Sequence, residues 1–240
     1  MKYITHGYWL GLVLLLGCQS SPQPSFRQHL QSLQAAPYRL VHDEEPFRLQ
    51  LDYQPPWLQA ARELLEGAKQ EKPIDPAAVE AQLRQYQGTA TFLLTVAPHP
   101  SLPPEERKRG DIVAAHPDRD TYANWLNHLM YGMHRYIYLV TPEGEKVPVG
   151  VYHLDRNWGM GFTNRLLLNF PLESGSAKLI EAASLELVVQ RLYPTLPEVR
   201  FAFPENPIRV GNLSAEEIAA SLTRPDDPKA APNDATPPAR

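Results

Sequence analysis

Alternation of apolar and polar residues is the most regular pattern along this chain. From Phe47 to Tyr53 every second residue is apolar, and the residues between them are polar. Successive side chains of a β-strand point to opposite faces, so this period of two predicts a strand over 46–53 with one buried and one solvated face. Other segments, half-polar or rich in β-branched and aromatic residues, predict strands at Thr89–Val96, Arg135–Val140, Val147–Leu154, Arg165–Phe170, Ala183–Leu192 and Val199–Phe203.

A period of three to four residues, typical of helices, appears between some of these strands. The stretch Trp57–Ala68 has apolar residues at this spacing. Asp75–Pro76 combines an N-cap residue with a proline at the first helical position, and predicts a helix as far as Tyr86. Asp120 is expected to cap another helix directly after it. Two more short helices are predicted, one over 26–36 after Ser25 and one after Ser214, where Ser214 and Glu217 form a capping-box pattern.

These elements predict a mainly β fold with added helices (α+β). Strands of half-polar alternation, without a strand–helix–strand repeat, favour antiparallel pairing. We therefore expect an antiparallel β-sandwich or a curled antiparallel sheet with two or three short helices. Residues 135–154 are expected to form a hairpin, because Thr141–Gly144 has proline and glycine at positions typical of a type I turn. Pro148 favours an edge or a bulge in the returning strand.

The first residues have the pattern of an export signal. Lys2 precedes an apolar run from Trp9 to Leu16, which is far shorter than the roughly 20 residues that span a bilayer. The junction Leu15–Cys18, which reads Leu-Leu-Gly-Cys, resembles the lipobox of bacterial lipoproteins. The resemblance implies cleavage before Cys18 and attachment of a diacylglycerol and an N-acyl chain such as palmitate. Several acyl chains make a stable anchor, since each buried methylene contributes about 0.8 kcal/mol.

Cys18 is the only cysteine of the chain, and lipidation accounts for this unpaired thiol in an exported protein. A single lipidated cysteine excludes a disulfide, a cysteine-based zinc site and a cysteine nucleophile from the mature domain. Gln19 rather than aspartate follows it, and by the sorting rule of enterobacterial lipoproteins this resembles a protein of the outer membrane. The tether that follows has no acidic cluster, which favours the periplasmic face.

The expected organisation has four parts: a lipoprotein signal peptide over 1–17, the lipidated cysteine and tether over 18–25, a single β-rich globular domain over 26–211, and a short helix with a disordered, Pro-rich tail over 212–240. Loss of the signal removes Lys2 and changes the formal net charge from −4 to −5. This acidic balance argues against nucleic acid as a partner. The expected partners are the membrane, through the anchor, and an envelope protein.

Two groups of polar residues are candidates for chemistry. His116, Asp118 and Asp120 occupy alternate positions, and a histidine with two carboxylates could together bind a divalent ion. The two aspartates also suit a turn and a helix cap. His153 and Asp155 fall on the same side of a strand, where the carboxylate can orient the imidazole as a base. No Gly-x-Ser-x-Gly elbow accompanies this pair.

A third group, Trp158 and Phe162, flanks a Gly-Met-Gly segment and is a candidate for binding a glycan, peptide or lipid. The alternative is a loop that both aromatic residues pin into the core. The segment lacks the Gly-Lys-Ser/Thr ending of a phosphate loop, and no cofactor is predicted. The sequence therefore favours a membrane-anchored, non-enzymatic binding or envelope-assembly module. The alternative is an envelope hydrolase that acts on glycan, peptide or lipid.

Overall fold

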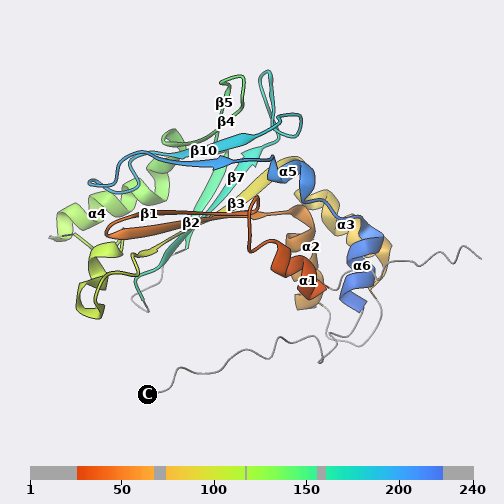
Figure 1. Cartoon of the computed structure of the whole chain (residues 1–240), viewed down its shortest axis with the longest axis horizontal. Helices are drawn as coiled ribbons and strands as arrows, with labels where there is room; N and C mark the ends of the chain where they lie inside the picture. Colours follow the sequence, from red (N-terminus) through yellow and green to blue (C-terminus); the bar gives the residue numbers. More distant parts are fainter. Residues whose placement is uncertain (1–25, 68–73, 117, 156–160, 224–240) are drawn as a thin grey trace, which may run out of the picture.

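The computed structural model describes residues 26–67, 74–116, 118–155 and 161–223, so Cys18 and the tail beyond Thr223 lie outside the described residues. Two antiparallel sheets pack face to face, with helices at both ends of this sandwich (Figure 1). The predicted α+β fold class with antiparallel sheets is confirmed. None of the described helices is long and apolar enough to cross a membrane.

The first sheet has the strand order β1–β2–β3–β7–β6. A row of leucines crosses its inner face, because Leu51 of β2 pairs with Leu94 of β3, which in turn pairs with Leu166 of β7. All three are fully buried, as the period of two requires. The strands are β1 (Arg39–Glu44), β2 (Phe47–Gln54), β3 (Thr89–Pro98), β6 (Val151–Asp155) and β7 (Asn164–Pro171).

The second sheet has the strand order β11–β10–β4–β5. Leu187 of β10 pairs with Phe201 of β11 on one side and with Leu139 of β4 on the other. The ring centroids of Phe203 in β11 and Phe92 in β3 lie 5.6 Å apart, so the inner faces of both sheets share one core. The strands are β4 (Ile137–Val140), β5 (Lys146–Pro148), β10 (Leu185–Val189) and β11 (Val199–Phe203); β8 (Glu173–Ser174) and β9 (Ala177–Lys178) form a separate small hairpin.

The predicted hairpin over 135–154 is correct only in its first half. Its turn forms at Thr141–Gly144, where the glycine N–H donates to the threonine carbonyl at 2.9 Å. Only β5 pairs with β4, however, whereas β6 pairs with β7 in the other sheet. Pro148 has no N–H for the ladder, and the N–H of Gly150 donates at 2.9 Å to the carbonyl of Asn169 in β7. The chain therefore crosses between the sheets at this glycine.

Helices α1, α2, α3 and α6 gather at one end of the sandwich (Figure 1). Trp57 of α2, Val79 of α3 and Ile218 of α6 share a second core there. The indole N–H of Trp57 also donates to the carbonyl of Gly211 at 2.7 Å. The helix predicted after Ser214 forms as α6 and packs into this core through Ile218. The expectation of two or three helices is wrong, since the described residues form α1 (Phe26–Ser32), α2 (Pro56–Gly67), α3 (Pro76–Tyr86), α4 (Arg119–Asn127), α5 (Pro207–Val210) and α6 (Ala215–Thr223).

At the opposite end, α4 continues into a π-helical turn, η2 (His128–Gly132), and then into a 3-10 turn, η3 (Met133–Arg135). A further 3-10 helix, η1 (Pro104–Gly110), lies in the connection that precedes α4. The predicted cap of α4 is wrong by two residues. Asp118, not Asp120, accepts the N–H of Thr121 at 2.8 Å. Asp118 has the extended backbone that an N-cap needs, whereas Asp120 already lies in the first helical turn.

Candidate functional site

A cavity of about 470 Å³ opens between α4 and the loop that joins β10 to β11. Figure 1 places both elements at the same end of the sandwich. Ligand pockets typically have volumes of roughly 300–1,000 Å³ and combine an apolar or aromatic lining with a few polar groups. The lining residues fit that description, and they are Trp125, Gln190, Arg191, Tyr193, Pro194, Leu196 and Glu198.

The aromatic part of the wall is held in place from several sides. The Trp125 ring lies 4.7 Å from the ring of His128, centroid to centroid, and meets Tyr193 edge-on at 6.1 Å. Tyr193 contacts the core ring of Phe47 at 5.0 Å, and its hydroxyl donates to the carbonyl of Ala115 at 2.5 Å. Burial raises the pKa of the Tyr193 hydroxyl above its ordinary value. The wall is therefore a rigid aromatic surface.

Arg191 enters the cavity wall from an unusual backbone conformation. Its φ of 51° makes it the one described residue other than glycine with a positive φ. Such a conformation costs roughly 1–3 kcal/mol and is concentrated at functional sites. Two contacts hold it: the Arg191 carbonyl lies 3.0 Å from Nε2 of His128, and the guanidinium lies 5.2 Å from the centroid of the Tyr136 ring. His128 itself belongs to the π-helical turn, a feature that also occurs often at functional sites.

Two charged side chains line the cavity, and only one is neutralised. Glu198 accepts hydrogen bonds from Gln190 and from Arg200, and these bonds lower the pKa of its carboxyl group. The guanidinium of Arg191 donates to the hydroxyl of Tyr136 at 3.2 Å. Among the described residues, no carboxylate oxygen lies within 4.0 Å of it. Arg191 is therefore the uncompensated charge of the site.

Two buried nitrogens near the cavity also lack a protein partner. Nε1 of Trp125 and Nε2 of His116 have no hydrogen-bond partner in the described part of the chain. The two rings lie 5.9 Å apart, so both nitrogens belong to one cluster. A buried donor that stays unsatisfied costs about 1–3 kcal/mol.

The three residues predicted as metal ligands have other roles in the structure. His116 packs against Trp125, Asp118 caps α4, and Asp120 is an exposed residue of the first helical turn. In the described ranges, no group of three or more His, Cys, Asp or Glu side chains is arranged to hold a metal ion. The structure therefore does not bring His116, Asp118 and Asp120 together as a ligand set.

The other predicted site residues lie away from the cavity. His153 and Asp155 are both exposed on the edge strand β6, and no hydrogen bond joins these two described side chains. Phe162 is 37% exposed and does not line the cavity. Trp158, its predicted partner, lies outside the described residues, as does Cys18.

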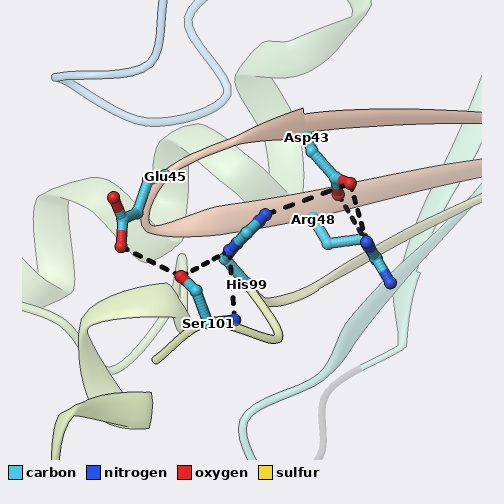
Figure 2. Close-up of polar contacts among 5 residues, drawn as sticks. All are labelled: Asp43, Glu45, Arg48, His99 and Ser101. Carbon is cyan, nitrogen blue, oxygen red and sulfur yellow. Dashed lines mark hydrogen bonds and ion pairs between the residues drawn. The ribbon is translucent and has the colours of Figure 1, made fainter. Parts of the chain in front are cut away.

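The sequence interpretation missed a polar network at the tip of the β1–β2 hairpin, which Figure 2 shows. His99 is central: its Nδ1 lies 2.7 Å from Oγ of Ser101, and its Nε2 lies 3.9 Å from Oδ2 of Asp43. The hydroxyl of Ser101 also donates to Glu45 at 3.1 Å. A hydrogen bond from Arg48 is the main cause that lowers the pKa of Asp43.

This network resembles a Ser–His–acid array in composition but not in geometry. A triad needs a carboxylate hydrogen-bonded to the histidine, and the 3.9 Å between His99 and Asp43 is too long for such a bond. Nδ1 of His99 also accepts the backbone N–H of Ser101 at 3.2 Å, which occupies the nitrogen nearest the hydroxyl. The network therefore ties the β1–β2 turn to the loop after β3.

Comparison with known proteins adds no family. No family model matches the sequence, and no curated protein matches it. A solved structure of a protein of unknown function from Burkholderia pseudomallei is 17% identical, with an alignment that covers 82% of this chain and 89% of the other. The TM-score is 0.34, and a likeness this loose carries no argument about fold or function.

Proposed function

We propose that this protein is a lipoprotein of the outer membrane, anchored through Cys18, whose folded domain is a non-enzymatic module that binds a ligand in the Trp125 cavity. The observation that carries the binding role is the combination of an aromatic cavity with an uncompensated guanidinium and a buried indole N–H without a protein partner. A cavity of this size that combines apolar rings with a few polar groups is the usual form of a small-molecule site, and the guanidinium without a carboxylate partner provides the charged group.

The anchor part of the proposal rests on the Leu15–Cys18 junction. A tether over 18–25 would hold the domain close to the periplasmic face of the membrane. Anchoring raises the effective concentration of the domain toward ligands and envelope proteins of the same membrane, and so compensates for a modest affinity of the cavity. An envelope protein that presents the ligand group is the partner that this arrangement suits.

The alternative function, an envelope hydrolase, receives less support. It requires a nucleophile, a base and a carboxylate in hydrogen-bond reach of one another. His153 and Asp155 are exposed and share no hydrogen bond in the described structure, and the Ser101–His99–Asp43 network lacks the carboxylate bond. Neither group lines the Trp125 cavity.

The anchor is tested with Cys18→Ala, and Ser20→Ala is the matched control in the tether. Incorporation of labelled palmitate and sedimentation with membranes are expected for the control and are lost in Cys18→Ala. A Cys18→Ala protein that remains labelled and membrane-bound would contradict the anchor.

The cavity is tested with the full-length protein in detergent, by following the indole N–H signals in NMR spectra. Trp125→Phe identifies the signal of Trp125, and the indole of Trp57, which is bonded to Gly211, is the internal control. We expect members of a panel of small aromatic acids, amides and amines to shift the Trp125 signal and leave that of Trp57 in place. A panel that leaves the Trp125 signal unchanged at millimolar concentration contradicts a binding role for this cavity.

A further inference from the structure

We propose that the Trp125 cavity recognises a carboxylate carried on a flat, apolar body, and that Arg191 is the residue that contacts the carboxylate. This inference rests on the proposed binding function and names the class of its ligand. It follows from three properties of the wall: the positive charge that no carboxylate offsets, the N–H donors that have no protein partner, and the shape of the apolar surface.

The charge of the cavity favours an anion. Arg191 lacks a carboxylate partner among the described residues, whereas Glu198 is bonded to Gln190 and Arg200 and its charge is offset. A guanidinium has five N–H donors in a fixed plane, and the hydroxyl of Tyr136 takes up only one nitrogen, Nη1. The remaining donors suit the two oxygens of a carboxylate, which a guanidinium can bind bidentately.

The hydrogen-bonding groups without a protein partner point to the same class. The indole N–H of Trp125 can only donate, and it has no partner among the described residues. The amide nitrogen of Gln190 is already used, since it donates to Glu198 and, at 3.3 Å, to the hydroxyl of Tyr138. The donors that the wall still offers are therefore the remaining N–H groups of Arg191, and an anion complements them.

The rest of the lining selects the body of the ligand. Trp125 and Tyr193 provide ring surfaces, and Pro194 and Leu196 provide aliphatic surface. Flat rings stack on such walls with centroids roughly 4.5–7 Å apart. A volume of about 470 Å³ admits a small molecule or the terminal residue of a peptide. Both sources offer the same chemistry, a carboxylate beside an apolar group.

The geometry also explains why Arg191 adopts its strained backbone. The left-handed φ and the contact between its carbonyl and His128 set the direction of the chain, while the Tyr136 ring supports the guanidinium. A cation over an aromatic ring keeps its donors aligned without neutralising its charge. The cationic group is thus positioned before the ligand arrives.

The test compares each acid with its primary amide, which has nearly the same shape and no charge. The probes are indole-3-acetate with indole-3-acetamide, and N-acetyl-phenylalanine with its amide, the second pair standing for a peptide end. The full-length protein in detergent is titrated while the indole N–H signal of Trp125 is recorded. We expect each acid to bind about tenfold more tightly than its amide, because a charge-assisted pair is lost in the amide.

The variants separate the charge of Arg191 from other effects. Arg191→Gln is expected to bring the acid to the affinity of its amide, and Arg191→Lys to keep a reduced preference. Arg165→Gln, at an exposed position of β7 outside the cavity, is expected to keep the full preference. An unchanged Trp57 signal reports that each variant is folded. If only indole-3-acetate is preferred over its amide, the carboxylate comes from a free small molecule. If only N-acetyl-phenylalanine is preferred, it comes from a peptide end.

Each contrary outcome has its own meaning. Equal affinity for acid and amide, or an acid preference that survives in Arg191→Gln, overturns the carboxylate class and leaves the binding function standing. Absence of any shift at Trp125 with all four probes overturns the carboxylate class as well. The broader panel of acids, amides and amines then decides whether the binding function fails with it.

Discussion

Replacing Arg191 by glycine is expected to yield a more stable protein than replacing it by alanine. Both variants lose the contacts of the side chain with Tyr136, so the difference between them isolates the backbone. At a φ of 51° alanine retains the steric penalty of the left-handed region, about 1–2 kcal/mol, which glycine does not have. Glycine loses about 0.5–1 kcal/mol more in conformational entropy on folding. The net advantage of glycine is then about 0.5–1 kcal/mol.

The same pair of substitutions at an ordinary position is the control. Arg165 is exposed in the regular strand β7, where alanine should be the more stable replacement by about 0.5–1 kcal/mol. Urea unfolding, measured on the full chain carrying Cys18→Ala to avoid lipidation, should give a midpoint about 0.2–0.5 M higher for Arg191→Gly than for Arg191→Ala, at equal slope. If alanine is as stable as glycine at position 191, the strain and its positioning role are refuted.

Three further predictions concern the fold. Phe92→Ala removes a fully buried ring and should cost about 3–5 kcal/mol of unfolding free energy, whereas Leu167→Ala, at a side chain 36% exposed, should cost far less in the same urea titration. Asp118→Ala should lower the melting temperature more than Asp120→Ala, because only Asp118 caps α4; equal effects would contradict the assigned cap. The backbone N–H of Thr121 is the main cause that lowers the folded pKa of Asp118 below its ordinary value of 3.8. The stabilisation that ionised Asp118 gives the folded protein is therefore complete above pH 3.8 and is lost as the pH falls through the folded pKa. The unfolding free energy of Asp118→Asn should accordingly fall less steeply in acid than that of the unaltered protein.

Strands whose two faces differ in polarity were predictable from the sequence. Leu166, Leu168 and Phe170 alternate with less buried residues, and the structure buries all three. A strand with one buried face must carry this period wherever it pairs, so the pattern is visible before any partner is known. The edge strand β1 escaped detection because its residues are half-buried or exposed and show no such contrast.

Helix ends were predictable where the cap is local. Asp75 accepts the N–H of Ala77 at 2.9 Å, and Ser214 and Glu217 exchange the hydrogen bonds of a capping box. At the start of α4 the sequence has two aspartates, Asp118 and Asp120, separated by one residue, and it does not show which of them caps the helix. Which one takes the extended backbone of an N-cap depends on how the preceding loop reaches the helix, and the loop is placed by long-range packing.

The strand exchange and the cavity depend on contacts between segments and were not predictable from the sequence. The sequence places residues 147–154 in one strand, but the switch of sheets at Gly150 depends on the carbonyl of Asn169 in β7, a strand of the other sheet. Trp125 and Arg191 are 66 positions apart in the chain, and no periodicity links them. A left-handed arginine has no sequence signal either, because its conformation is imposed by the contacts of His128 and Tyr136 rather than by its own preference. Patterns of burial are properties of a segment, whereas a binding cavity is a property of the distances between segments.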